Sequence, residues 1–447
     1  EFEPVIEGRV RGYTWTYGDG ARDANLCMPS HAYGTAGVYS VILSASNYTG
    51  TAAATVTVQV ASMDAAHYYV ALGGGHVSPF TNWAMAASNI QAAVDVAAVG
   101  GTVWVSNGVY DLGGVAGYPV STNLLTNRVA IHKPVTVRSV NGPQMTAIKG
   151  SRPYSDAAVR CVFMTNGASL IGFTLTNGAT RPWGWGDVLS EQSGGGVWCQ
   201  STNVVISNCV IVGNLSSDNG AGVARGRLFN CTVSYNTGNG VFQSVLYDCL
   251  LIGNSGSAGG AAAESALNNC TLVGNSATFG GATYQGSLMN CIAYYNHASN
   301  GSNTFGSSAS YSCTTPDPGG TGNITTPPNF VATGSGYGAN HVAGNYRQAP
   351  GSPCVNTGTN QPWMTGATDL DGLPRIYGGI VDMGAYEYGA FQVLGTNLAA
   401  IANEQTAVSL ADGTDYGDVG TLSTHTHAFT ITNSLTNAVG VGSVTTN

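Results

Sequence analysis

The sequence predicts an all-β chain built around a parallel β-helix, with antiparallel β-sandwich modules on either side of it. Two observations carry this prediction: a short motif recurs about every 21 residues, and alternating apolar and polar residues with Gly and Asp turns occupy the N-terminal part. A fixed period indicates one structural unit stacked on copies of itself. The motif is Asn-Cys-x-x-x-x-Asn at 208–214, 230–236, 269–275 and 290–296, with Asp in first place at 248–254 and a weaker sixth copy at Ser312-Cys313.

The residues around each cysteine predict one coil with three short strands. Side chains alternate along a strand, so Cys209 and Ile211 share one face. Ile206 stands three positions before Cys209, which breaks the alternation, and a bend at Asn208 restores it. We therefore expect these three side chains to point into the core. The Asn that closes each copy is followed by a polar or Gly-containing stretch, as a turn requires.

The cysteines of the motif are expected to be buried and reduced. On successive coils, about 4.8 Å apart, their side chains point the same way, which disfavours disulfide geometry. A buried free Cys acts as a small hydrophobe. This expectation covers Cys209, Cys231, Cys249, Cys270 and Cys291, while the state of Cys27, Cys161, Cys199 and Cys354 stays open.

Charge and hydropathy exclude several classes of function. Only 8% of the residues are charged, the net charge is −9, and Lys133 and Lys149 are the only lysines. This composition argues against nucleic acids and anionic membranes as partners. No apolar run approaches the length of a membrane span, so we expect no membrane insertion. Low charge with abundant Gly, Asn, Ser and Thr suits an extracellular or cell-surface β-protein.

Residues 1–61 predict a small antiparallel β-sandwich. Aromatic and alternating stretches at 13–20, 31–34 and 37–43 end in Gly and Asp turns. These stretches resemble the PKD domain, an immunoglobulin-like module of surface proteins with the pattern Trp-x-x-Gly-Asp-Gly, His-x-Tyr and Gly-x-Tyr-x-Val. The resemblance lacks the first strand of that family. We expect Asp19 to shape a turn rather than bind a metal ion.

Residues 62–390 are assigned to the parallel β-helix and its caps. A strand at 67–70 and a short helix that starts with a capping box at 88–91 predict the N-terminal cap. Covering the open end of a β-helix prevents edge-to-edge association. Long loops interrupt the coils at 110–127 and 177–192.

The helical cap, the Asn-Cys coils and the ending, which includes 369–375 and 381–388, resemble right-handed β-helix proteins of bacterial surfaces that carry a "choice-of-anchor Q" ending. That resemblance implies a pectin-lyase-like architecture and a secreted or surface location, and it implies no reaction. Residues 391–447 are similar to part of a "choice-of-anchor D" immunoglobulin-like module. We therefore expect a segment of a longer modular polypeptide.

The acids of the coils do not predict catalysis. Glycoside hydrolysis needs two carboxylates that flank the bond, and lyases acting on uronates need a base together with a cation. No two acids share a column on neighbouring coils, and Asp248 is interpreted as a turn residue of the Asn column. The charged residues between 194 and 313 are Asp218, Arg225, Arg227, Asp248 and Glu264.

A cluster around the second long loop is the candidate site for glycans. Tyr154, Trp183, Trp185 and Asp187 are the glycan-binding candidates, because indole faces can stack on sugar rings. The alternative, which we favour, is a loop that folds over a coil and buries its tryptophans. The whole cluster comprises Arg152, Tyr154, Asp156, Arg160, Arg181, Trp183, Trp185, Asp187 and Glu191.

Acids near the end of the β-helix segment are a second candidate. Their oxygens could bind calcium, but we favour turns and ion pairs that seal the C-terminal end. His425 and His427 share one strand face without a third ligand, so we expect neither a metal site nor a cofactor. The acidic group consists of Asp369, Asp371, Asp382 and Glu387, with Arg375.

These observations favour a non-catalytic extracellular structural or adhesive protein. Its expected partners are copies of itself or neighbouring modules of a longer, filament-forming chain, with glycans as further candidates. The alternative is a carbohydrate-active lyase or hydrolase, or a glycan-binding module, that uses the 152–191 cluster.

Overall fold

The computed structural model describes two compact units, residues 1–67 and 68–447, which are considered separately. It describes residues 10–26, 29–31, 33, 37–48, 50–60, 67–152, 155–184, 186–389, 391–394, 400–401 and 430–433.

The first unit is an antiparallel sheet in the order β2-β1-β3-β4. Trp15, Tyr17 and Val41 form its buried core. Asp19 shapes a turn as expected: its Oδ1 accepts the Ala21 N–H at 3.0 Å, and its Oδ2 lies 2.6 Å from His31 Nε2. The strands are β1 (Gly12–Thr16), β2 (Arg22–Ala24), β3 (Gly37–Ser46) and β4 (Thr51–Val60).

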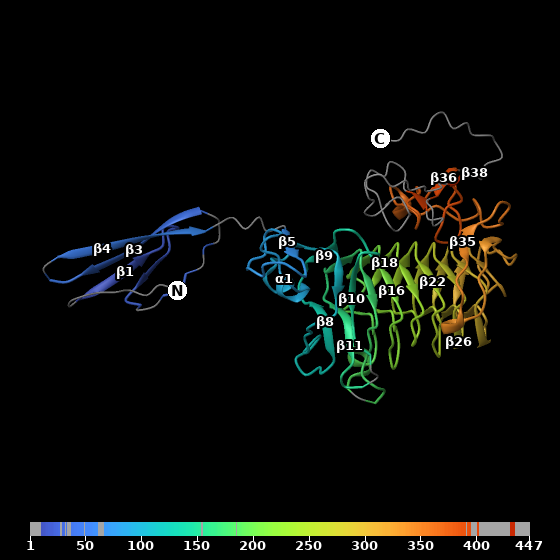
Figure 1. The fold of residues 1–447 in the computed structure, drawn as a ribbon, viewed down its shortest axis with the longest axis horizontal. Helices are drawn as coiled ribbons and strands as arrows, with labels where there is room; N and C mark the ends of the chain where they lie inside the picture. The colour runs from blue at the N-terminus through green and yellow to red at the C-terminus, as the bar shows by residue number, and fades with distance from the viewer. Residues whose placement is uncertain are drawn as a thin grey trace, which may run out of the picture. The chain divides into compact units, whose positions relative to one another are not determined.

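The second unit is a parallel β-helix, which confirms the predicted fold (Figure 1). Each coil adds one strand to each of three parallel sheets. The ten-stranded sheet contains β5 (His67–Val70), β6 (Thr102–Val105), β9 (Thr136–Ser139), β12 (Ser169–Ile171), β15 (Val205–Ser207), β18 (Arg227–Phe229), β21 (Val245–Tyr247), β24 (Ala266–Asn268), β28 (Ser287–Met289) and β32 (Ser308–Ser310). The nine-stranded sheet contains β7 (Gly108–Tyr110), β10 (Thr146–Lys149), β13 (Thr174–Thr176), β16 (Val210–Val212), β19 (Thr232–Ser234), β22 (Leu250–Ile252), β25 (Thr271–Val273), β29 (Ile292–Ala293) and β33 (Cys313–Thr314). The eight-stranded sheet contains β8 (Thr126–Ile131), β11 (Val159–Met164), β14 (Val197–Cys199), β17 (Val223–Ala224), β20 (Val241–Phe242), β23 (Ala262–Ala263), β27 (Thr283–Tyr284) and β31 (Thr304–Phe305).

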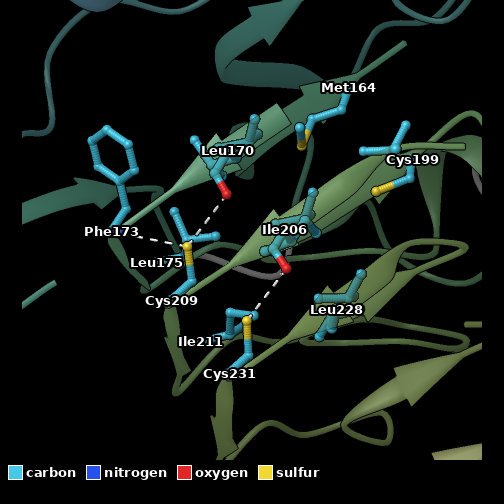
Figure 2. Close-up of a cluster of buried hydrophobic side chains, with 14 of the residues drawn as sticks. Met164, Leu170, Phe173, Leu175, Cys199, Ile206, Cys209, Ile211, Leu228 and Cys231 are labelled. Atoms are coloured by element: carbon cyan, nitrogen blue, oxygen red, sulfur yellow. Dashed lines mark hydrogen bonds between the residues drawn. The ribbon is translucent and has the colours of Figure 1, made fainter. Parts of the chain in front are cut away.

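The bend predicted before each cysteine is present. Asn208 has a φ of 51°, in the left-handed region that Asn tolerates. Ile206, Cys209 and Ile211 are all buried in the interior, and Figure 2 shows them stacked beneath the side chains of the preceding coil. The corresponding residues of the following coils also have positive φ, namely Asn230, Asp248, Asn269 and Asn290.

The five motif cysteines form one interior column. Thr232 pairs with Val210, so Cys231 lies beside Cys209, and Thr232 N–H donates to Cys209 O at 2.9 Å. Phe173 begins the column, because its N–H donates to Cys209 Sγ at 3.4 Å. All nine cysteines of the described residues are free and buried, and Cys27 lies outside those residues. The expected interior column of cysteines is therefore present.

The sixth copy of the motif is shifted by one residue relative to the other five. Ser312, not Cys313, ends the cysteine column, because Ser312 Oγ accepts the Cys291 N–H at 3.0 Å. Cys313 instead pairs with Ile292. One residue of offset turns a strand side chain to the opposite face, so Cys313 lies on the outer face of its sheet.

The Asn that closes each copy is a buried member of a hydrogen-bonded ladder. Asn236 Nδ2 donates to Asn254 Oδ1 at 2.9 Å, and the Asn236 N–H donates to the same oxygen at 3.1 Å. The second hydrogen of the amide reaches Ile211 O, on the preceding coil, at 2.9 Å. Each Asn thus satisfies the backbone of its neighbours inside the core. The ladder runs through Asn214, Asn236, Asn254, Asn275, Asn296 and Asn303.

Helix α1 (Ile90–Val96) covers the N-terminal end with its predicted apolar stripe. Its N-cap is Asn89, whose side chain accepts the Ala92 N–H at 2.9 Å, so the capping box expected at Ser88 is wrong. The side-chain amide of Gln91 forms the two hydrogen bonds that a neighbouring strand would form with Ala130. It accepts the Ala130 N–H at 2.7 Å and donates to Ala130 O at 3.1 Å. At Ala130, the backbone of β8, the edge strand of the eight-stranded sheet, is therefore hydrogen-bonded.

Residues 315–389, the lateral segment, close the last coil and then run back along the outside of the β-helix. Ile324 closes the end, because its N–H donates to Ser312 O at 2.9 Å and its carbonyl accepts the Thr314 N–H at 2.9 Å. The segment then packs on the outer face of the nine-stranded sheet. Its elements are β34 (Phe330–Ala332), η1 (Gly338–Asn340), β35 (Asn345–Gln348) and η2 (Pro362–Met364), and a separate antiparallel sheet consists of β36 (Phe391–Leu394), β37 (Ala400–Ile401) and β38 (Thr430–Asn433).

Candidate functional site

The acids of the 152–191 cluster hold a loop in place. Asp187 is the N-cap of the short helix α2 (Val188–Glu191), and its Oδ2 accepts the Ser190 N–H and hydroxyl, both at 2.7 Å. A helix N-cap needs such an acceptor, because the first N–H groups have no partner within the helix. The carboxylate of Asp187 therefore has a local structural role.

Glu191 is buried and ties two long loops together. Its Oε1 accepts the N–H groups of Leu124 at 2.7 Å and Leu125 at 3.1 Å, and its Oε2 accepts the Asp187 N–H at 3.1 Å. Burial alone would raise the pKa of Glu191, but these donors and Arg181 together hold it below its usual value. Glu191 is thus an ionised anchor whose oxygens face protein donors.

The arginines of the cluster also bind to other groups of the protein. Arg160 is fully buried and donates to the carbonyl oxygens of Gly194, Ser190 and Ser193. Burial lowers its pKa. Arg181 forms ion pairs with Asp156 at 2.6 Å and Glu191 at 3.2 Å, and Arg152 donates to Gly213 O.

The tryptophan at the tip of the loop is accessible. Trp183 is 74% exposed, so the expectation of a buried tryptophan is wrong for this residue. Tyr154 and Trp185 lie outside the described residues. Of the four glycan-binding candidates, Trp183 therefore offers an open ring, while Asp187 is occupied by its N-cap contacts.

The C-terminal acids surround a buried arginine rather than an ion site. Arg375 Nη2 lies 2.6 Å from Glu387 Oε1, and Arg375 Nη1 lies 3.0 Å from Asp248 Oδ1. Asp369 and Asp382 accept backbone N–H groups, including that of Glu387 at 2.7 Å on Asp369 Oδ2. The expected ion pairs and turns are present, but they seal the side of the β-helix and not its end.

Burial raises the carboxyl pKa values in this group. Desolvation raises the pKa of Asp248 to about 7, of Asp369 to about 6 and of Glu387 to about 8, with Arg375 opposing the shift in each case. Asp371 forms a separate pair with Arg347 at 2.5 Å.

The ion pair of Asp248 was not predicted from the sequence. It occupies the bend column as expected, with a φ of 51°, but it is also 1% exposed and pairs with Arg375. The available signal was its departure from the Asn of the other copies. An acid in a buried column indicates a cation nearby.

Among the described residues, no group of three or more His, Cys, Asp or Glu is arranged to hold a metal ion. His425 and His427 lie outside those residues. No helix in the described part of the chain is long and apolar enough to span a membrane.

Comparisons with known proteins identify the first unit. Residues 4–62 match the PKD domain family. This PKD module contains the aromatic strand β1 and the Asp19–His31 pair. A search of curated proteins gives no match. Among solved structures, a rhamnogalacturonan lyase is similar with a TM-score of 0.35 and 13% identity over 52% of this chain and 69% of the lyase. A similarity this distant carries no argument about activity.

Proposed function

We propose that this chain is a non-catalytic structural or adhesive segment of an extracellular or cell-surface polypeptide, in which a stiff β-helix is joined to a PKD module. PKD modules are typical of extracellular proteins, and one occupies residues 4–62. Copies of the same chain or neighbouring modules of a longer chain are the proposed partners.

The observation that carries this proposal is the use of the candidate catalytic acids as structural groups. Glu191 accepts three backbone N–H groups and pairs with Arg181, and Asp187 caps a helix. A general acid or base must reach a proton on the substrate. Carboxylates whose oxygens are turned toward protein donors are poorly placed for that role.

Turnover assays test the proposal. We expect no cleavage of pectate, alginate, rhamnogalacturonan or neutral glycans, with or without calcium. Asp187→Asn and Glu191→Gln are the informative variants. Cleavage by the unmodified protein that disappears in either variant, while the circular dichroism spectrum is unchanged, would replace this proposal with the lyase or hydrolase alternative.

Glycan binding is a second candidate, favoured by the exposure of Trp183. An exposed indole face can stack on a sugar ring and requires no catalytic acid. Affinity electrophoresis in gels containing soluble polysaccharides measures this directly. Retardation that Trp183→Ala abolishes supports a binding module, and equal migration of both proteins in every gel removes this candidate. The exposed Trp83 supplies a matched control variant, Trp83→Ala.

A further inference from the structure

The lateral segment closes the last coil on two of its three sheets. On the ten-stranded sheet, the Tyr311 N–H donates to Thr321 O at 2.7 Å. On the nine-stranded sheet, the Thr314 N–H donates to Ile324 O at 2.9 Å. The eight-stranded sheet ends at β31, and no further strand of the described residues pairs with it. The last coil is therefore open along one sheet in the described part of the chain.

The preceding coil shows which way the backbone groups of β31 point. The Thr283 N–H donates forward to Asn303 O, on the last coil, at 2.9 Å. Thr304 pairs with Thr283, so its N–H and carbonyl point in the same direction, beyond the last coil. The Gln285 N–H also donates forward at 2.9 Å, and Gly306 holds the equivalent position. Within the described residues, neither the Thr304 nor the Gly306 N–H meets an acceptor.

This edge carries none of the features that usually protect a strand edge. Natural proteins place charged side chains or Pro on exposed edges, because these hinder the pairing of an added strand. No Asp, Glu, Lys or Arg occurs between Glu264 and Asp317. The strand itself consists of Thr and Phe. An uncharged strand can therefore approach β31 without repulsion and without burying an unpaired charge.

The opening over β31 is one strand deep. Ile324 pairs with Cys313 as the next parallel strand would, so the closing residues fill a single layer beyond the other two sheets. The first coil of a second copy does not supply the missing strand, because Gln91 already binds the backbone of its edge at Ala130. One extended segment is therefore what the opening fits.

We propose that β31 binds an extended, uncharged segment of another polypeptide as an added parallel strand. Phe305 stacks on Tyr284, with ring centroids 5.9 Å apart and an interplanar angle of 3°, and is still 39% exposed. A further aromatic side chain can continue this stack. The fitting segment has a small residue before an aromatic one, as in Thr283-Tyr284 and Thr304-Phe305. The inference rests on the proposed structural function, to which it gives a contact surface.

A synthetic peptide tests the proposal. It has the sequence of residues 280–287, Gly-Gly-Ala-Thr-Tyr-Gln-Gly-Ser, because this segment contains β27, which pairs in parallel with β31. Fluorescence anisotropy of the labelled peptide reports its binding to the full chain. We expect saturable binding, and an affinity about ten-fold lower for a peptide methylated at the tyrosine nitrogen, which cannot donate to Thr304 O. The proposal is wrong if neither peptide saturates up to about 1 mM, or if both bind equally.

Hydrogen exchange of the full chain examines the edge itself. Without peptide, the amides of Thr304 and Gly306 should exchange faster than those of Thr283 and Gln285, whose N–H groups are hydrogen-bonded. Adding the peptide should slow the first pair and leave the second unchanged. Equal protection of both pairs in the chain alone would show that β31 is already covered and would overturn the proposal.

Variants of the edge complete the test. Thr304→Pro removes an outward donor but keeps the Phe305 N–H, and should abolish peptide binding. Phe305→Ala keeps every backbone donor and should weaken binding several-fold, so it serves if the proline variant does not fold. Trp83→Ala, at an exposed aromatic residue of the N-terminal cap, is the control and should bind as the wild type does. Unchanged binding by the folded edge variants would overturn the proposal but leave the turnover assays of the proposed function unaffected.

Discussion

Asp248 and Arg375, 127 residues apart in the chain, meet at 3.0 Å in the protein interior. Asp248 comes from the bend of a central coil and Arg375 from the lateral segment. Both side chains are almost fully buried. This pair, together with Glu387, makes the attachment of the lateral segment sensitive to protonation.

Stability should therefore fall as the pH rises from about 4 to about 8. Asp248 and Glu387 have pKa values near 7 and 8 in the folded protein, above the values of about 4 expected in the unfolded chain. The folded state binds more protons across this window, so the stability present at pH 4 is lost as the pH rises through the folded pKa values. We expect a loss of about 2 kcal/mol or more, measured by denaturant unfolding at pH 5 and pH 8.5.

Asp248→Asn is the matched variant, because Asn occupies this bend in the neighbouring coils. It removes one of the groups that titrate. We expect a shallower dependence of the unfolding free energy on pH than in the wild type. A slope equal to that of the wild type would show that Asp248 does not titrate in this window.

The thiols of the cysteine column should not react in the native protein, and a charged side chain in the column should destabilise the fold. Cys249→Asp places an unpaired carboxyl between Cys231 and Cys270, and should lower the unfolding free energy by several kcal/mol. Cys249→Ser, which can donate to the Tyr247 carbonyl as the thiol does at 3.2 Å, should be milder. Thiol titration of native protein should label the column only after denaturant is added. Fast labelling of the column in native buffer would contradict the interior position.

The Asn ladder should be a major source of stability. Asn254→Ala removes the acceptor of the Asn236 N–H and the donor to Val233 O at 2.8 Å, and should cost about 3 kcal/mol or more of unfolding free energy. Asn300→Ala on the exposed strand β30 (His297–Asn300) is the control, with an expected effect within about 0.5 kcal/mol. If both variants lost the same unfolding free energy, the ladder hydrogen bonds would contribute no more to stability than an exposed Asn does.

Loss of the Glu191 anchor should release the loops at 110–127 and 177–192. Glu191→Ala leaves the N–H groups of Leu124 and Leu125 without their acceptor and Arg181 with one acid fewer. Limited proteolysis should cut these loops at least several-fold faster than in the wild type. Glu264→Gln, at an exposed acid on a regular coil, should leave the cleavage rate unchanged.

The regular coils were predictable because their determinants are local. The period, the left-handed bend at Asn208 and the inward column of Cys209 follow from strand alternation within one copy of the motif. The buried role of the closing Asn could not be predicted, for a related reason. Asn favours turns, and the local sequence does not distinguish an exposed turn from one whose amide is stacked inside, as at Asn254.

The lateral segment could not be derived in the same way. Contacts such as Asn269 Nδ2 to Asp382 O, at 3.1 Å, join residues 113 positions apart and leave no periodic trace in the sequence. The shift of Cys313 could not be predicted from spacing either, because the same 22 residues separate Cys209 from Cys231, which both lie in the column. At the glycan candidates, the exposure of Trp183 depended on how α2 and Glu191 fix the loop, which no spacing rule encodes.

The course of the lateral segment also determines how the rod carries tension. We expect a pull on residue 389 to act first on the middle coils, because Arg375 and Asp382 contact Asp248 and Asn269 there. The force would then act across the β-helix axis and would shear several buried contacts at once. These contacts include the ion pairs of Arg375 with Asp248 and Glu387. The last coils are thereby shielded from being peeled off one strand at a time, so the molecule is expected to resist stretching through its middle rather than to unravel from its end.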